Sequence, residues 1–167
     1  KEAEKTQQNN TKPLVEKIEL CAPVSGTVKA LSDVPDKTFA EKVLGDGAAI
    51  IPEEGKVYAP ADGTVANIMD SKHGIMFVTD SGAEVLIHIG LDTVNLKGKY
   101  FKSYVSDGDK VKKGTLLVEF DLEAIKGEGY NLITPMVVTN ISDYIKAVCM
   151  EKENTAINAG DKFLTVV

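Results

Sequence analysis

The chain has 167 residues, of which 43% are hydrophobic and 26% are charged, and its formal net charge is −6. This length predicts one domain with a real core, and neither a run long enough to span a membrane nor a signal-peptide pattern is present. Nucleic-acid binding needs clustered Lys and Arg, so the acidic balance argues against it. The charge fits either a basic protein partner or simply a well-solvated surface.

The first segment, residues 1–13, reads KEAEKTQQNNTKP and is too polar to bury apolar area. It is predicted to be a linker or mobile tail. The chain lacks an initial methionine, which suggests a domain cut from a longer polypeptide or a removed tag. The periodic pattern begins at Leu14, and residues 14–167 are predicted to form a single domain.

Most of the remaining chain has the pattern of strands, because short β-branched runs alternate with Gly, Asp and Pro turns. The clearest predicted strands are Val57–Ala59, Gly63–Met69, Met76–Thr79, Glu84–Ile89, Leu116–Phe120 and Met136–Val138. Helical segments are few and short: Leu122–Lys126, and Ser142–Ala147 with Ser142 as its N-cap. The pattern predicts an all-β sandwich or barrel with one or two short helical turns.

A motif occurs twice. Cys21–Leu31 reads CAPVSGTVKAL and Tyr58–Ile68 reads YAPADGTVANI, so both contain A-P-x-x-G-T-V. Proline suits the first residue of a strand and glycine a tight turn or bulge, so the motif predicts a duplicated β unit, unless two hairpin entries are alike by chance. A looser similarity, through a shared GDK, links Gly108–Phe120 with Gly160–Val167.

The chain contains two histidines, His73 and His88, separated by a predicted hairpin whose turn lies around residues 80–82. A four-residue loop pairs the two histidines directly, and a two-residue loop makes them diagonal neighbours, roughly 5–8 Å apart at Cβ. Only a three-residue loop places them on opposite faces. The hairpin therefore favours a His–His cluster, although a lone strand histidine is more often structural.

Strand alternation indicates which face carries His88. Val85, Ile87 and Ile89 form the apolar set that packs into the core, so His88 is expected on the other face. Beside the imidazoles, Gly74 and Gly90 leave space for a ligand or for another backbone segment.

Two histidines are too few for a zinc site unless a carboxylate or a partner completes it. A neutral imidazole can instead act as a nucleophile. Phosphoryl transfer needs an in-line nucleophile and donors to the equatorial oxygens, so His88 could attack while His73 stabilises the charge and Ser71 assists.

The segment Gly82–Leu96, GAEVLIHIGLDTVNL, resembles the active-site signature of the glucose-type enzyme IIA (EIIA) family of the bacterial phosphoenolpyruvate:sugar phosphotransferase system. The similarity extends over about residues 16 to 167. Further family-like segments are Ala22–Val28, Asp33–Gly47, Ala59–Ile68, Glu119–Leu122 and Thr134-Pro135.

The resemblance implies an antiparallel β-sandwich, a barrel-sandwich hybrid with a duplicated motif. It implies that Nε2 of His88 takes phosphate from phosphorylated HPr and gives it to a cysteine of a IIB domain, with no cofactor of its own. The Gly90 carbonyl would hold the other ring nitrogen, which keeps Nε2 unprotonated. His73 and Ser71 match the family's assisting pair. No metal is required, although His73 and His88 could share a zinc ion with a partner's carboxylate.

The resemblance also implies a docking surface. Carboxylates that meet basic partner residues would be Asp36 and Asp92, and the surrounding apolar ring would be Phe39, Leu44, Met69 and Leu86. Lys37, Thr38, Met69 and Leu86 depart from the best-known member, which bears on partner preference. HPr and the IIB and IIC domains are the expected partners, IIB and IIC possibly in the same polypeptide.

Cys21 and Cys149 occur in no metal or redox spacing and fit a cytoplasmic setting. The resemblance implies that the domain reaches the membrane only through the permease. The sequence does not indicate which sugar is transported. A lysostaphin-type zinc endopeptidase is a weaker alternative, because His88-Ile89-Gly90 lacks the second histidine of H-x-H. A lipoyl or biotinyl carrier module is a second alternative, but this chain lacks the hairpin that holds the modified lysine in that class. A regulatory interaction domain is compatible with the first interpretation.

Overall fold

The computed structural model of the chain describes residues 17–167. The predicted linker (residues 1–13) and the predicted start of the domain at Leu14 lie outside the described residues.

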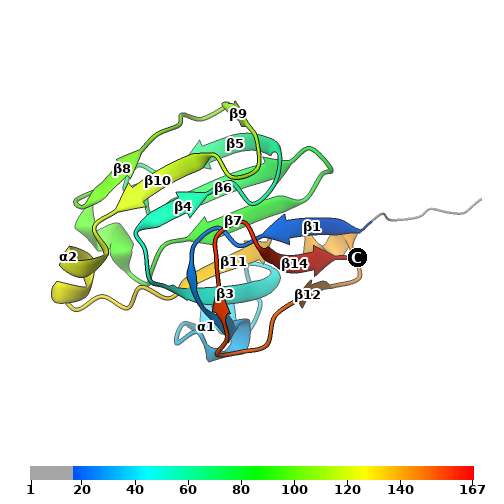
Figure 1. Cartoon of the computed structure of the whole chain (residues 1–167), viewed down its shortest axis with the longest axis horizontal. Helices are drawn as coiled ribbons and strands as arrows, with labels where there is room; N and C mark the ends of the chain where they lie inside the picture. Colours follow the sequence, from blue (N-terminus) through cyan, green and yellow to red (C-terminus); the bar gives the residue numbers. More distant parts are fainter. Residues whose placement is uncertain (1–16) are drawn as a thin grey trace, which may run out of the picture.

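Strands are the main regular secondary structure of the described chain (Figure 1). In chain order they are β1 Ile18–Cys21, β2 Gly26–Ala30, β3 Asp46–Pro52, β4 Lys56–Tyr58, β5 Gly63–Ile68, β6 Gly74–Thr79, β7 Glu84–His88, β8 Phe101–Ser103, β9 Lys110–Val111, β10 Leu116–Phe120, β11 Thr134–Val138, β12 Ala147–Cys149, β13 Ala156–Ile157 and β14 Lys162–Val166. The helical elements are the 3₁₀ turns η2 Leu31–Asp33, η3 Thr93–Leu96 and η4 Ile141–Asp143 and the helices α1 Lys37–Ala40 and α2 Leu122–Gly127.

The strands form three antiparallel sheets. The largest has eight strands in the order β13-β2-β3-β11-β7-β6-β5-β9, and two smaller sheets have the orders β1-β14-β12 and β4-β10-β8. The first and last strands, β1 and β14, lie side by side (Figure 1). Side chains from all three sheets, such as Leu164, Val118 and Ile87, join one buried core. The predicted antiparallel β-sandwich is confirmed.

The two A-P-x-x-G-T-V segments are structurally equivalent. Cys21 donates its N–H to the carbonyl of Pro60, and Tyr58, at the equivalent position of the second copy, donates to the carbonyl of Pro23, both at 2.8 Å. This reciprocal exchange is what a pseudo-two-fold axis between duplicated units produces. The predicted duplication is therefore present in the fold.

The looser similarity between Gly108–Phe120 and Gly160–Val167 does not match equivalent positions of the fold. Gly160 donates its N–H to Ala22, and Gly114 donates to Ala59, the residue equivalent to Ala22, both at 3.0 Å. Gly160 therefore corresponds to Gly114 and not to Gly108. The shared GDK reflects a short turn that recurs along the chain, and turn chemistry of this kind is local.

The six predicted strands all form, with ends shifted by at most two residues, and predicted helix Leu122–Lys126 is α2. The predicted helix Ser142–Ala147 is wrong. Ser142 lies in the 3₁₀ turn η4, whose N-cap is Asn140, and the chain then enters the edge strand β12, which pairs with β14. Tyr144 packs against the core whereas Val148 is exposed, so tertiary pairing decides the structure of this segment.

A second apolar cluster covers the other face of the eight-stranded sheet. Strand residues that point away from the main core meet residues of η2, α1 and the loops around them; the buried members of this outer cluster are Leu31, Val34, Phe39, Ala49, Leu86, Leu91, Ile133 and Val137. Helix α1, which the sequence pattern did not predict, lies on this face because its Phe39 packs into the outer cluster. Asp36 caps the helix by accepting a 2.9 Å hydrogen bond from the Thr38 N–H.

Candidate functional site

The β6–β7 hairpin places the two histidines together by a route that differs from the predicted one. Its loop has three residues (80–82), with Gly74 opposite His88, which is the register expected to separate the imidazoles. The rings nevertheless lie 4.8 Å apart between centroids and nearly perpendicular, at 85°. His73 precedes β6 and follows Lys72, whose φ is +63°, so strand alternation does not apply to it. The cluster is confirmed, and the register argument for it is wrong.

The ring of His88 is held in one tautomer. Its Nδ1 lies 2.7 Å from the Gly90 carbonyl, which can only accept, so Nδ1 carries the proton and Nε2 of the neutral ring has a free lone pair. Burial lowers the pKa of His88, while the Gly90 carbonyl and the carboxylates of Asp36 and Asp92 act in the opposite direction. A neutral imidazole with a free Nε2 is a nucleophile at pH 7.

The second imidazole, His73, is more deeply buried, with 4% of its surface exposed. Burial, and secondarily the neighbouring His88, lower the pKa of His73 from 6.5 to about 4, so this ring is also neutral at pH 7. Ser71 Oγ lies 2.9 Å from its Nδ1. When the hydroxyl donates to Nδ1, the proton of the neutral ring sits on Nε2, where it can be donated to an oxygen beside His88.

The predicted apolar ring is only partly a surface. Phe39 and Leu86 are 3% and 5% exposed, so they form the buried support of the site, and the Phe39 ring lies 5.2 Å from that of His88. Met69 is half-buried and packs against the same outer cluster, whereas Leu44 is exposed. Phe39 belongs to α1 and packs with Leu86 in the outer cluster, so of the four predicted ring residues these two are not at the surface.

The two predicted carboxylates occupy different surroundings. Asp36 is half-buried and caps α1, and Asp92 is exposed with a φ of +61° at the start of η3. Both act electrostatically on His88, so the structure brings both to the site.

The predicted residues leave out one side of the site. A hollow of about 400 Å³ lies beside Ser71 and is also lined by Val94, which is half exposed. Val94 lies in the His88 motif, but only the structure shows that its apolar side chain is exposed.

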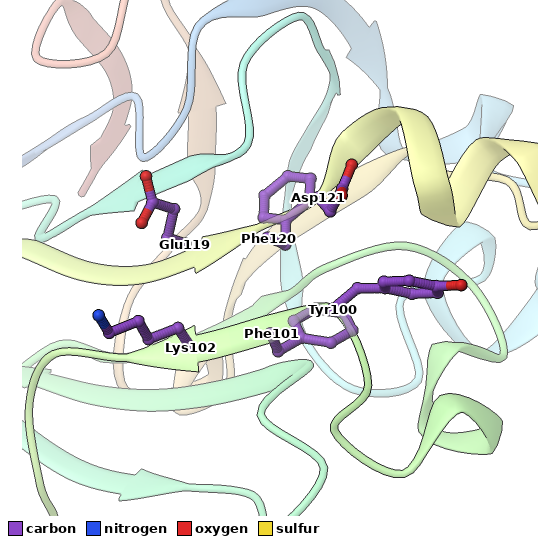
Figure 2. Close-up of a pocket in the computed structure, with 6 residues that line it drawn as sticks. All are labelled: Tyr100, Phe101, Lys102, Glu119, Phe120 and Asp121. Atoms are coloured by element: carbon purple, nitrogen blue, oxygen red, sulfur yellow. The ribbon is translucent and has the colours of Figure 1, made fainter.

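A second hollow of about 400 Å³ lies on the sheet that contains β8 and β10. Figure 2 shows Tyr100 and Asp121 at one side of it and Lys102 and Glu119 at the other. These polar groups already serve the fold: the Tyr104 hydroxyl donates to Glu119, Lys102 lies over the Tyr104 ring, and Asp121 caps α2. The pair of imidazoles therefore remains the better candidate site.

Across residues 17–167, no three His, Cys, Asp or Glu side chains converge in a way that could hold a metal ion. A zinc ion shared with a partner's carboxylate stays a prediction. Within the same described part of the chain, no helix has the length and apolar character needed to cross a bilayer.

The family model described as phosphoenolpyruvate-dependent sugar phosphotransferase system, EIIA 1, matches residues 18–144. The beta-glucoside-specific EIIBCA component of the phosphotransferase system (PTS) of Bacillus subtilis is 53% identical over 123 residues, covering 74% of this chain and 20% of that protein. The glucose-specific EIIA component of Halalkalibacterium halodurans is 46% identical over 146 residues, covering 87% of this chain and 83% of that protein. Among solved structures, the glucose permease IIA from Mycoplasma capricolum has a TM-score of 0.80 at 31% identity, covering 90% of this chain and 96% of that chain.

Together, the sandwich fold, the paired neutral imidazoles and these relatives define the class, a phosphotransferase component of a sugar phosphotransferase system. Within that class, the chain belongs to the EIIA 1 family. It spans about a fifth of the length of the first curated relatives that it matches, 20% of one and 23% of another.

Proposed function

We propose that this domain carries a phosphoryl group on Nε2 of His88. The observation that supports this most directly is the hydrogen bond from Nδ1 of His88 to the Gly90 carbonyl, which leaves the Nε2 lone pair free. In the forward step this lone pair forms the new N–P bond while the N–P bond of phosphohistidine in HPr breaks. No proton has to leave Nε2, and no cofactor beyond the incoming phosphoryl group is needed.

His73 and Ser71 assist the transfer. As three equatorial oxygens gain charge in the transition state, a proton on Nε2 of His73 can be donated to one of them, with Ser71 holding the other ring nitrogen. His73 is largely buried, so this hydrogen bond acts in a partly dry site, where it is worth more than in water.

The partners follow from the family and from the relatives. HPr supplies the phosphoryl group, and a cysteine of a IIB domain receives it, so that the N–P bond breaks as an S–P bond forms. The names EIIBCA and EIICBA of several relatives join A with B and C, which supports IIB and IIC as partners within one polypeptide. We place the domain on the cytoplasmic side of such a permease. Asp36, Asp92, Leu44 and Met69, with Phe39 and Leu86 beneath them, form the proposed docking surface.

Incubation with phosphoenolpyruvate, enzyme I and HPr tests the proposal. The chain should gain one phosphate that is labile in acid and stable in alkali, detected by mass spectrometry. His88→Ala should gain none, whereas the matched variant His73→Gln should still accept. If folded His88→Ala accepts the phosphate, the assignment of the carrier is wrong.

A further inference from the structure

The carbonyl that orients His88 belongs to a peptide unit that is held from both sides. The unit between Gly90 and Leu91 accepts from Nδ1 of His88 at its carbonyl, and its N–H donates to the backbone carbonyl of Asn131 at 2.9 Å. In a planar trans peptide the C=O and the N–H point in opposite directions. The Asn131 carbonyl therefore aims the Gly90 carbonyl at the imidazole.

Thr93 closes the turn in which this peptide lies. Its side chain has no exposed surface, and its hydroxyl donates to the Ile89 carbonyl at 2.5 Å. Its methyl group stands against Gly90, 2.9 Å from where a Cβ would be, and the φ of Gly90 is +75°. Thr93 thus fixes the carbonyl before Gly90 and supports the Gly90 backbone from behind.

The Asn131 carbonyl, which accepts the N–H of Leu91, is also held in place. Asn131 lies in the loop between α2 and β11, and its side-chain oxygen accepts the N–H of Ile133 at 2.9 Å. This local bond fixes the direction of the Asn131 backbone. A chain of hydrogen bonds therefore runs from this loop, through the Gly90–Leu91 peptide, to His88.

We infer that Thr93 is a positioning residue, which together with Asn131 holds the Gly90 carbonyl so that His88 keeps its proton on Nδ1 and presents a free Nε2. The inference rests on the proposed function for its link to phosphoryl transfer, but not for its structural part. Thr93 is enclosed and bonded to the backbone, so it acts on the reaction only through His88.

The test compares Thr93→Val, which keeps the shape and removes the hydroxyl, with Thr93→Ser, which keeps the hydroxyl. The first readout is the ¹⁵N NMR signal of each histidine nitrogen in the folded, unphosphorylated chain. In the parent and in Thr93→Ser, Nδ1 of His88 should be protonated and Nε2 bare, whereas Thr93→Val should show a mixture of tautomers. The second readout, the rate of phosphorylation by phospho-HPr, should fall by about tenfold or more in Thr93→Val, by analogy with the loss of hydrogen bonds that orient metal-ligating histidines.

The matched control is Thr79→Val. Thr79 is also buried and hydrogen-bonded through its hydroxyl, to the Ala83 N–H, but it lies at the turn end of the same hairpin. Its loss should lower stability and leave the His88 nitrogen signals unchanged. Parental signals and rate in folded Thr93→Val would overturn the inference.

Should Thr93→Val not fold, Asn131→Ala decides the question. Asn131 is exposed, so its substitution leaves the core intact while freeing the loop carbonyl. Parental His88 signals in that variant would count against the chain of hydrogen bonds. Failure of the proposed function gives a different result, because the parent itself would then accept no phosphate while the NMR comparison still reports on the tautomer.

Discussion

His73 links stability to pH. Its pKa is lowered from 6.5 to about 4 by burial and by His88, so between these values the unfolded chain binds a proton that the folded chain excludes. The contribution of the neutral His73 ring to the free energy of unfolding is therefore complete above pH 6.5 and is lost as the pH drops toward 4. The loss amounts to up to about 3 kcal/mol. Chemical denaturation at pH 7, 5.5 and 4.5 should show a smaller loss in His73→Gln than in the parent.

Comparing the parent with His73→Gln at the same pH isolates the contribution of His73, because the carboxylates titrate in both proteins. Parallel loss of stability in parent and variant would show that the buried ring contributes nothing to the acid sensitivity of the fold.

The same substitution tests the role of His73 in transfer. We expect His73→Gln to accept phosphate from HPr but to pass it to IIB roughly tenfold to a hundredfold more slowly, less than the usual loss for removing an oxyanion donor because the amide keeps an N–H. Rapid-quench measurement with a IIB domain gives the rate. A folded variant that accepts no phosphate at all would instead make His73 the carrier or an equal partner.

Among the elements, β3 and β6 occupy equivalent positions in the duplicated fold. In β6, Gly74 lies opposite His88, and in β3, Gly47 lies opposite Val137. His88, the proposed carrier, therefore has the buried Val137 as its counterpart, and the pair of histidines occurs in only one of the two units.

The two equivalent glycines differ in what an added methyl group would meet. At Gly74 a Cβ would lie 2.4 Å from Sδ of Met69, a flexible side chain, whereas at Gly47 it would lie 2.0 Å from the carbonyl oxygen of Met136 in the neighbouring strand. We expect Gly74→Ala to cost about 1 kcal/mol and Gly47→Ala about 3 kcal/mol or more, at the two ends of the usual range for overpacking. Urea unfolding of both variants decides this, and an equal or larger cost at Gly74 contradicts it.

How far the sequence predicted these elements depends on where each signal lies. The His88 strand, its core face and the Gly90 contact were predicted because alternation and the motif are contained in a few adjacent residues. The hairpin register was not, since one residue of loop length decides it and His73 lies in an irregular bend. Helix α1 was missed because a single capping turn near Asp36 has no periodicity.

The helix predicted in the C-terminal segment was wrong for a different reason. The run from Ser142 to Ala147 has weak helical preference, and the strand β12 exists only because β14 lies beside it, so information from a distant part of the chain decides it. The same holds for Thr93 and Asn131: the motif contains Thr93, but the sequence does not say that a loop thirty-eight residues further on completes the support of Gly90.

At the scale of the whole molecule, the net charge is −6, and two of the carboxylates, Asp36 and Asp92, lie beside His88. Carboxylates in this position can guide a basic partner to the site. Asp92 is exposed beside His88 and has a φ of +61°, a conformation that asparagine tolerates well, so Asp92→Asn removes the charge without straining the turn. Charges at the rim of an interface act mainly on the rate of association and on its salt dependence.

We therefore expect Asp92→Asn to slow the association with HPr most at low salt. The deficit should shrink as salt rises, since the Debye length falls from about 30 Å at 0.01 M to about 8 Å at 0.15 M. The matched control is Asp143→Asn, an exposed carboxylate that lies beyond the turn end of the β6–β7 hairpin and whose contact with Asn140 is long, at 3.4 Å; it changes the net charge equally. Stopped-flow measurement across salt concentrations should separate the two variants. If both slow association to the same extent, only the total charge matters, and if neither does, the acidic surface serves solubility alone.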